Sequence, residues 1–247
     1  WCSFMTLWWR SILLIVLGLA LWQVGVSASH LPAYFLPGPM AVFKSLWHNA
    51  LLISQEALVT LMEMVLGFLL ATVVGVWSAI ILSYCRPLRL GLLPVLVFSQ
   101  AIPTFAIAPL LVLWLGYGLS SKIAITMLML FFPIMSAFLD GLLMPRPDLM
   151  NMASLMTTSR WRLLVSIQIP SALPKLASGL RVAAAGAPLA AIIGEWVGAN
   201  RGLGYLLLEA NARLQMDLVF AILLILVVLS LLVYYSIDEV LKRWITW

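Results

Sequence analysis

The chain has 247 residues, of which 64% are hydrophobic and only 9% are charged. Soluble domains carry roughly 25% charged residues, so this composition argues against a water-soluble fold. The formal net charge is +5, but the basic residues are scattered between apolar runs rather than gathered into one patch, which argues against nucleic-acid binding. Composition and charge together predict an integral membrane protein.

Six apolar segments approach the length of a membrane span. A helix needs about 20 apolar residues to cross the hydrocarbon core, and none of these segments has the period-two alternation of a barrel strand. We therefore expect an all-α membrane protein with a single transmembrane domain over residues 1–247. The first segment is interpreted as a span rather than a signal peptide, because further spans follow it. The six predicted transmembrane helices cover approximately residues 11–27, 62–83, 90–116, 121–143, 179–197 and 218–237.

The distribution of Lys and Arg predicts the orientation of these helices. With the N-terminus in the cytoplasm, ten of the 14 basic residues fall in cytoplasmic segments, and Lys44, Lys122, Arg201 and Arg213 stay outside. Cytoplasmic loops of membrane proteins are enriched in basic residues. Both termini are therefore predicted to be cytoplasmic.

Two predicted loops are long enough to carry function: an outer loop over residues 28–61 and an inner loop over residues 144–178. The outer loop contains a turn-forming Leu-Pro-Gly-Pro stretch at residues 36–39. It continues into a weakly amphipathic segment, residues 42–53, that is suited to lie along the membrane surface. The inner loop is the more informative of the two.

The inner loop is predicted to form two short helices that are broken near residues 157–159, where Ser159 is placed to cap the second helix. That second helix mixes Arg160, Trp161 and Arg162 with large apolar side chains. Its exposed face is suited to dock into a groove on a cytoplasmic partner. The alternative is an interfacial helix whose Trp and Arg side chains are anchored at the lipid headgroups.

Motifs for enzymatic chemistry are not found in the sequence. The stretch Gly202-Leu203-Gly204 lacks the Lys and the Ser or Thr that a phosphate-binding loop needs to hold nucleotide and magnesium. The two histidines lie in the predicted outer loop, and no carboxylates are spaced like a catalytic dyad or a metal site. We expect neither an enzyme nor a chain that binds a cofactor or metal.

The inner loop resembles the cytoplasmic loop of binding-protein-dependent ABC importer permeases, whose pattern is Glu-Ala-Ala, three residues, Gly, nine residues and Ile-x-Leu-Pro. In this alignment the family Glu falls at Asn151, the second Ala at Ala153, the Gly at Thr157, and the closing motif at residues 167–170. The spacing is kept, while the family Glu and Gly are absent.

Further stretches are similar to the nitrate, sulfonate and taurine branch of this family: residues 100–103, 114–118, 194–198 and 202–205. The resemblance implies a type I importer fold in the bacterial inner membrane, with this chain as a permease homodimer. It also implies a cytoplasmic ATPase dimer that holds ATP and an external solute-binding protein. The residues that the resemblance assigns to coupling with the ATPase are Asn151, Ala153, Thr157, Ser159, Arg160, Trp161, Arg162 and Pro170.

The substrate that the resemblance suggests is the pyrimidine precursor of thiamine. A sulfonate, taurine, nitrate or a riboflavin-like compound is the alternative within the same transporter class. A stand-alone channel, a secondary transporter and a membrane scaffold without transport activity are the alternatives of other classes. A secondary transporter is expected to carry intramembrane ion-coupling residues or inverted repeats, and neither is evident in the sequence.

Candidate pathway residues come from the third and fifth predicted spans. Ser99, Gln100 and Thr104 lie beside prolines, where freed backbone carbonyls can line a polar passage, although bonding between helices is an equally ordinary use of such side chains. Pro188 marks either a gating hinge or a tolerated kink. Glu195 is interpreted either as a gate residue or as a structural carboxylate bonded to neighbouring helices.

Two further carboxylates, Glu63 and Asp140, lie near predicted span ends. We expect each to reach solvent or to pair with a basic neighbour, and we do not expect either to bind the substrate.

Overall fold

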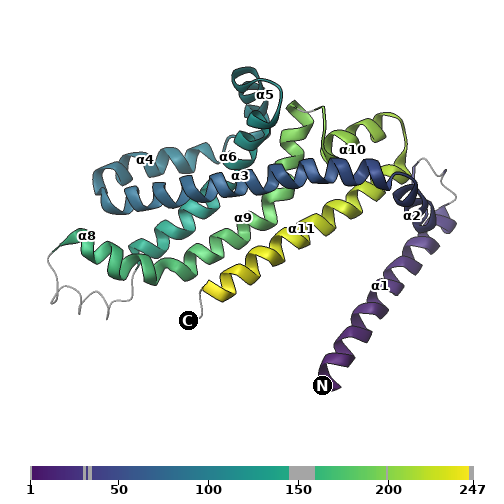
Figure 1. Cartoon of the computed structure of the whole chain (residues 1–247), viewed down its shortest axis with the longest axis horizontal. Coiled ribbons are helices and arrows are strands. Elements are labelled where there is room, and N and C mark those ends of the chain that lie inside the picture. Colours follow the sequence, from purple (N-terminus) through teal and green to yellow (C-terminus); the bar gives the residue numbers. More distant parts are fainter. Residues whose placement is uncertain (1, 30–31, 33–34, 145–158, 199, 245–247) are drawn as a thin grey trace.

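The computed structural model of the chain describes residues 2–29, 32, 35–144, 159–198 and 200–244. Within these residues the chain is almost entirely helical, and the described part contains no strand. Figure 1 shows the arrangement of the helices. In chain order they are α1 (Cys2–Ser29), α2 (Pro39–His48), α3 (Ala50–Tyr84), α4 (Arg86–Ser99), α5 (Thr104–Leu115), α6 (Leu119–Leu143), α8 (Arg160–Leu163), the π-helix η1 (Leu164–Gln168), α9 (Ile169–Gly198), α10 (Leu203–Ala212) and α11 (Met216–Trp244).

The bundle is built around α6, which packs against both α3 and α9. Helix α11 lies against α9, while α2 and α10 pack at one end of α11, far from α8 (Figure 1). Helix α1 leaves the bundle at that same end, where the ring of Trp22 stacks on Phe220 with a centroid distance of 5.7 Å.

Small residues allow the three central helices to pack closely. A Cβ atom on Gly67 of α3 would lie 2.4 Å from Thr126 Cγ2 of α6, and one on Gly179 of α9 would lie 2.9 Å from the Pro133 carbonyl oxygen of α6. In lipid the hydrophobic effect does not drive helices together, so association relies on close approach of this kind. Alanines such as Ala184 and Ala187 continue the contact in the core between these helices.

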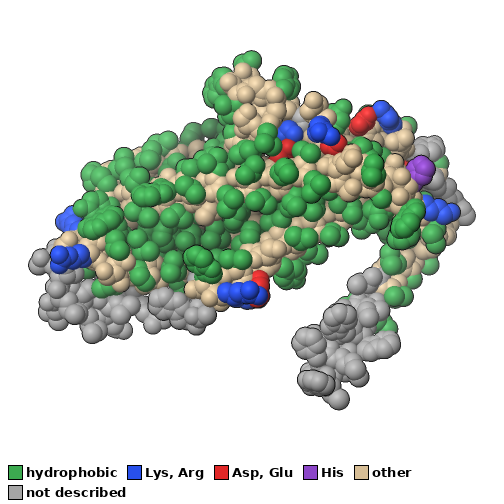
Figure 2. All heavy atoms as spheres, viewed as in Figure 1, with side chains coloured by type: hydrophobic (Ala, Val, Ile, Leu, Met, Phe, Trp, Pro, Cys, Tyr) green, Lys and Arg blue, Asp and Glu red, His purple; other side chains and the backbone are tan. Residues whose placement is uncertain are grey.

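The outer surface of the bundle is apolar. Figure 2 shows a face covered mostly by hydrophobic side chains, with the charged side chains gathered at its edges. Large apolar side chains such as Leu69, Val73 and Trp77 of α3 are more than half exposed. Such a surface suits a hydrocarbon environment and would be a liability in water.

Four helical segments are long and apolar enough to cross a membrane: Ala50–Tyr84, Leu119–Leu143, Arg160–Gly198 and Met216–Trp244. The predicted span over residues 90–116 is not a single helix, because α4 and α5 meet at a bend of 99°. Pro103 explains this break, since proline donates no backbone hydrogen bond and disfavours helical geometry in the residue before it. The bent pair makes a fifth candidate span.

The first predicted span lies within α1, but the described apolar part of that helix, Val16–Ser29, is shorter than a span. Five of the six predicted segments lie within continuous helices and the segment 90–116 is broken at residues 100–103, so the described residues supply four or five candidate spans rather than six. The predicted orientation of the termini stays a prediction.

The region of the predicted outer loop, residues 28–61, is largely helical, and α2 overlaps the amphipathic segment that was expected over residues 42–53. Residues 39–48 form α2, and α3 begins at Ala50 rather than near residue 62. Neither Pro nor Gly occurs between Ala50 and Leu61, and buried contacts of Ile53 and Thr60 hold this part of α3 in place. Helix-forming sequence with one buried face continues the helix beyond the apolar run.

The predicted inner loop over residues 144–178 is also shorter than expected. Helix α8, the π-helix η1 and α9 form one continuous helical segment from Arg160 to Gly198. The π turn lies just before Pro170 and Pro174 of α9, which is where a helix accommodates backbone bonds that prolines remove. Residues 145–158, the first of the two predicted short helices, lie outside the described residues.

Candidate functional site

A cluster of ionisable side chains lies buried where α3, α6 and α9 meet. Glu63 of α3 is 0% exposed and Glu195 of α9 is 1% exposed. Lys122 of α6 is also buried, and its Nζ lies 2.6 Å from Glu63 Oε1. A charge at such a place is costly unless it is paired and hydrogen-bonded. The ammonium of Lys122 pairs with one oxygen of Glu63, while Glu63 Oε2 has no hydrogen-bond partner in the described part of the chain.

The loop between α9 and α10 binds to this cluster through consecutive backbone amides. Gly202 N donates to Glu56 Oε2 at 2.5 Å, and Leu203 N donates to Thr60 Oγ1 at 2.9 Å. Gly204 N donates to Glu195 Oε2. Three adjacent donors are therefore satisfied by side chains from α3 and α9, which joins the start of α10 firmly to both helices.

Further contacts connect the members of the cluster. Thr60 Oγ1 donates to Glu195 Oε1 at 2.6 Å, and Lys122 Nζ donates to the Arg201 carbonyl oxygen at 3.3 Å. Arg201 Nε lies 3.7 Å from Glu56 Oε1. We call Glu56, Thr60, Glu63, Lys122 and Glu195 the α3–α6–α9 cluster.

Gly202 is required by this geometry. Its φ of +111° lies in a region that side chains rarely adopt, and a Cβ there would fall 2.2 Å from Glu195 Oε1. Glycine alone tolerates both conditions. The sequence feature Gly-Leu-Gly at residues 202–204 thus serves to bring backbone amides against carboxylates.

The structure places Glu195 entirely within protein contacts. Its partners are Thr60 and Gly204, as expected of a structural carboxylate bonded to neighbouring elements. Its role as a gate residue stays a prediction. Pro188, the candidate hinge, is buried within α9 two turns before Glu195.

Glu63 and Lys122 show what the sequence analysis missed. Glu63 pairs with a basic residue, as one of the two expected possibilities had it, but it is fully buried rather than close to solvent. Lys122, which was expected on the outer side, is buried in the first turn of α6 and pairs with Glu63. The spacing of Glu56, Thr60 and Glu63 at i, i+4 and i+7 on one helical face was the available signal. Asp140 is exposed.

The break between α4 and α5 brings Ser99, Gln100 and Thr104 to one bend. Ser99 and Gln100 are exposed in the isolated chain and Thr104 is partly buried. Ser99 Oγ donates to its own helix at the Leu96 carbonyl oxygen, at 2.7 Å. Exposed apolar side chains surround this bend, among them Val95, Phe98, Phe105, Leu113 and Trp114. No residue of α4 is buried.

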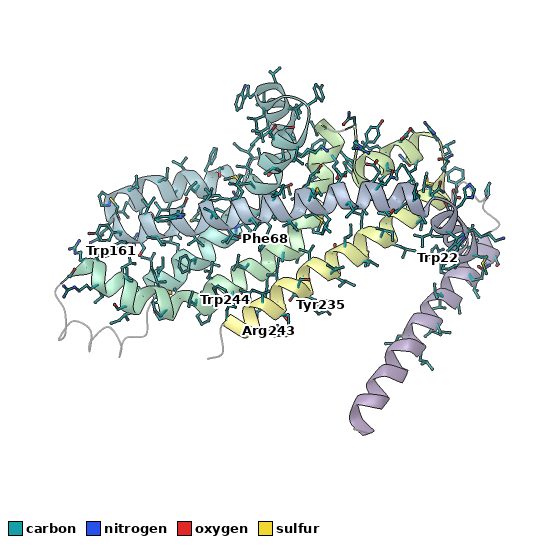
Figure 3. The ribbon with its side chains drawn as sticks, in the orientation of Figure 1. Trp22, Phe68, Trp161, Tyr235, Arg243 and Trp244 are labelled. Atoms are coloured by element: carbon teal, nitrogen blue, oxygen red, sulfur yellow. The ribbon has the colours of Figure 1, made fainter. Side chains whose placement is uncertain are left out.

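At the opposite end of α9 from Glu195, Arg160, Trp161 and Arg162 of α8 are exposed, and we call these three residues the α8 end. Trp161 is 57% exposed, and its ring meets Tyr84, the last residue of α3, edge to face at 6.1 Å. Figure 3 shows Trp161 at the extremity of the molecule.

Two further residues that were predicted to couple the chain to the ATPase lie near the α8 end. Ser159 precedes α8, and its carbonyl oxygen accepts a hydrogen bond from Leu163 N at 3.1 Å. Pro170 is the second residue of α9 and is partly buried. Asn151, Ala153 and Thr157 lie outside the described residues.

A protein-family model described as "Binding-protein-dependent transport system inner membrane component" matches residues 71–246. A protein of Haemophilus influenzae named "Probable ABC transporter permease protein" is 48% identical over 236 residues, which cover 96% of this chain and 96% of the relative.

Two relatives carry names that mention a substrate. The riboflavin transport system permease protein of Chloroflexus aurantiacus is 36% identical, over 93% of this chain and 88% of the relative. The formylaminopyrimidine transport permease protein of Halalkalibacterium halodurans is 31% identical, over 93% of this chain and 92% of the relative.

The fold is similar to a chain of the methionine ABC transporter MetNI, solved in inward-facing conformations. The TM-score is 0.66 at 19% sequence identity, over 78% of this chain and 96% of that chain.

Proposed function

Because the chain belongs to the family of binding-protein-dependent transport system inner membrane components, the ABC transporter permeases of importer type, we propose that it imports the pyrimidine precursor of thiamine. Family members are permease subunits and are not themselves catalytic. The proposal therefore includes a separate cytoplasmic ATPase dimer, an external solute-binding protein and a second copy of this chain.

The α8 end is proposed as the docking point of the ATPase. Its two arginines and a largely exposed tryptophan combine charge with a large apolar surface, which is the composition of strong contacts between proteins. The helical segment that begins there runs without interruption for 39 residues, about 58 Å along its axis. That segment ends beside the α3–α6–α9 cluster. A displacement imposed at α8 is therefore passed along one element to the opposite end of the bundle.

The second copy of the chain is proposed to cover the α4–α5 face. Helix α4 has no buried residue in the isolated chain, although its side chains are largely apolar. Two copies that meet at this face would bring both bends, with Ser99, Gln100 and Thr104, toward a shared axis. Polar groups beside a broken helix are suited to line a solute pathway.

The substrate proposal rests on the two relatives whose names mention one. Both names describe nitrogen heterocycles, a flavin and a formylaminopyrimidine. Riboflavin is retained as the second candidate, because the riboflavin permease is 36% identical and the formylaminopyrimidine permease 31%. Sulfonates, taurine and nitrate serve as comparison substrates.

Reconstituted uptake tests this proposal. The permease is placed in proteoliposomes together with its cognate ATPase and solute-binding protein, and accumulation of labelled formylaminopyrimidine is measured with and without ATP at the ATPase side. We expect ATP-dependent accumulation that unlabelled pyrimidine reduces and taurine does not. If the vesicles accumulate riboflavin and not formylaminopyrimidine, riboflavin replaces the pyrimidine as the proposed substrate.

A control separates the proposed importer from a channel. In the same vesicles the ATPase carries a substitution that abolishes hydrolysis. An importer then stops accumulating solute, whereas a channel still equilibrates it down its gradient. Equal fluxes with both ATPases would overturn the importer mechanism for this chain.

A further inference from the structure

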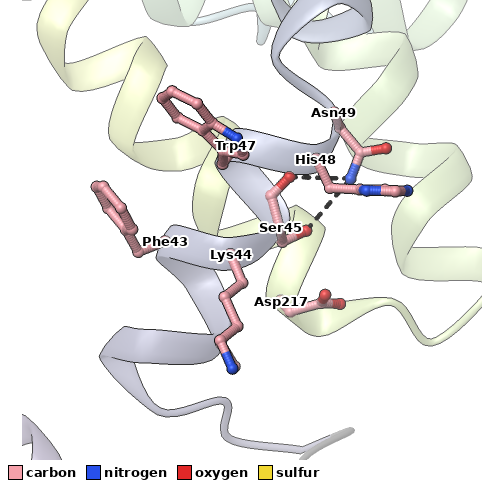
Figure 4. Close-up of a pocket in the computed structure, with 8 residues that line it drawn as sticks. Phe43, Lys44, Ser45, Trp47, His48, Asn49 and Asp217 are labelled. Atoms are coloured by element: carbon pink, nitrogen blue, oxygen red, sulfur yellow. Dashed lines mark hydrogen bonds between the residues drawn. The ribbon is translucent and has the colours of Figure 1, made fainter.

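A surface cavity of about 690 Å³ lies between α2 and the start of α11. Charged and polar side chains of both signs line it: Lys44 and His48 from α2, Asp217 from α11, and Ser45 and Asn49 beneath them. Figure 4 shows Lys44 extending from α2 and Asp217 from α11, with Phe43 and Trp47 on the other side of α2. None of the ion pairs in the described part of the chain involves Lys44 or Asp217.

The floor of this cavity is already satisfied by the protein itself. Ser45 is buried, and Asn49 Nδ2 donates to the Ser45 carbonyl oxygen at 3.0 Å. The groups that remain available are therefore the charges at the opening. Lys44 supplies a cation and Asp217 an anion within one cavity, and His48 adds a ring that donates hydrogen bonds.

An apolar groove of about 490 Å³ adjoins the polar cavity, and Trp47 lines both. The groove runs along two membrane helices: its walls include Ile53, Ala57, Leu58 and Leu61 of α3, and Ile225 and Leu229 of α11. It contains almost no polar surface apart from Ser54, whose hydroxyl donates to the Leu51 carbonyl oxygen at 2.9 Å.

One kind of ligand would fit both the polar cavity and the apolar groove. A polar cavity of mixed charge at the start of α11, which opens beside an apolar groove that runs along the spans, matches a phospholipid headgroup and its acyl chain. Trp47 lines both hollows and is 79% exposed. Exposed tryptophans of membrane proteins are enriched at the membrane interface. Lys44 is placed to extend toward a phosphate.

We propose that α2, α3 and α11 bind one phospholipid with a zwitterionic ammonium headgroup, of the phosphatidylethanolamine class. Lys44 and His48 take the phosphate, Asp217 accepts hydrogen bonds from the primary ammonium, and an acyl chain fills the groove between α3 and α11. Asp217 selects the headgroup, because an anionic glycerol headgroup offers no cation to this carboxylate.

Native mass spectrometry of the full-length permease tests this binding. The protein is purified, stripped of lipid and incubated with phosphatidylethanolamine or phosphatidylglycerol of matched chains. We expect one phosphatidylethanolamine per chain, held in preference to phosphatidylglycerol. Asp217→Asn should reduce the preference for phosphatidylethanolamine over phosphatidylglycerol roughly threefold, because a solvent-exposed charge pair contributes about that much to binding. Lys44→Gln should weaken binding of both lipids.

Matched controls are available at the other end of the molecule. Arg86→Gln removes an exposed cation of α4, and Glu239→Gln removes an exposed carboxylate of α11. Neither should change lipid retention. Equal retention of the two lipids by the unmodified chain, or a preference that Asp217→Asn leaves unchanged, overturns the proposal and leaves a general lipid annulus only.

A photoreactive side chain identifies what fills the groove. With p-benzoylphenylalanine at Leu58, inside the groove, irradiation in mixed-lipid nanodiscs should give adducts enriched in phosphatidylethanolamine. The same group at Leu69, an exposed α3 position outside the groove, should report the bulk lipid composition. A Leu58 adduct with a second copy of the permease would show that protein fills the groove and would overturn the lipid assignment.

Discussion

The two ends of the helical segment Arg160–Gly198 differ in how their polar groups are satisfied. At the Glu195 end, carboxylates, an ammonium, a hydroxyl and three backbone amides bind one another in the interior. At the α8 end, Arg160, Trp161 and Arg162 are exposed, and the tryptophan has one aromatic neighbour, Tyr84. The first end is largely satisfied by its own chain, with Glu63 Oε2 left without a hydrogen-bond partner among the described residues, whereas the other end presents its side chains outward.

This difference separates residues that hold the permease together from residues that are available to a partner. Buried charge contributes to stability only while every member keeps its partner, so the α3–α6–α9 cluster is sensitive to single substitutions. Exposed charge contributes little to folding, so the α8 end is free to be used in binding. The same classes of residue thus have opposite consequences when they are substituted.

The largest effect is expected from Lys122→Met. The substitution leaves Glu63 buried with no cation, which costs about 3–5 kcal/mol in the free energy of unfolding. The midpoint of thermal unfolding in detergent, together with the yield of folded protein, measures this loss. The double variant Lys122→Met, Glu63→Leu should recover most of it, because it removes both charges. If Lys122→Met alone unfolds like the unmodified chain, the ion pair is not a determinant of the bundle.

A smaller effect is expected from Gly202→Ala. Alanine at this position must adopt an unfavourable φ, and its Cβ must displace the Glu195 carboxylate. Together these two effects cost about 2–4 kcal/mol in the free energy of unfolding. Gly116→Ala is the matched control, because Gly116 has φ +81° and a Cβ added there would meet no atom within 4 Å. Gly116→Ala should therefore show the backbone strain alone, about 1–2 kcal/mol. Equal midpoints of thermal unfolding for the two variants would show that the Glu195 carboxylate moves aside without loss of stability.

The sequence predicted the helical membrane class and the family correctly, because apolar runs and the pattern near residues 151–170 are local signals. It did not predict the start of α3 at Ala50 or the bend between α4 and α5. The start of α3 depends on tertiary contacts, because Thr60 is held by Glu195 and by Leu203, which lie more than 130 positions away in the chain. The bend follows from Pro103, a single residue within an apolar run. A hydropathy average over many residues lowers the score of polar helical positions such as Thr60, and so assigns the start of α3 to a loop.

The candidate site was predicted only in part for the same reason. Glu195 was singled out because a carboxylate within a span is unusual. Its partners Thr60 and Gly204, and the pair Glu63 and Lys122, could not be matched to one another from one sequence, because pairing between helices requires their packing. The exposure of Arg160, Trp161 and Arg162 could be expected from a short stretch of sequence, and their role in coupling stays a prediction.

A third prediction concerns Glu195→Gln, which keeps the shape of the side chain and removes its charge. The amide oxygen can accept from Gly204 N, and the amide nitrogen can donate to Thr60 Oγ1 if the threonine hydroxyl turns to the Glu56 carbonyl oxygen, 3.2 Å away. We expect a loss of about 1 kcal/mol in stability and uptake close to that of the unmodified permease. Glu195→Ala, which leaves Gly204 N unsatisfied, is the disruptive comparison. Uptake abolished by Glu195→Gln at unchanged stability would instead support the gate interpretation.

The smallest effect on stability, within about 0.5 kcal/mol, is expected from the double variant Arg160→Glu, Trp161→Ala, because the substituted side chains are exposed. Its effect on assembly should be the reverse: we expect the purified permease to lose its ATPase subunits during size-exclusion chromatography, although its unfolding midpoint is unchanged. Arg213→Glu provides the control at the other end, since Arg213 is also exposed and pairs with Glu209 at 2.5 Å. That variant should keep the ATPase. If both variants retain it in full, the exposed side chains of α8 do not form the docking surface, and the contrast between the two ends reflects folding alone.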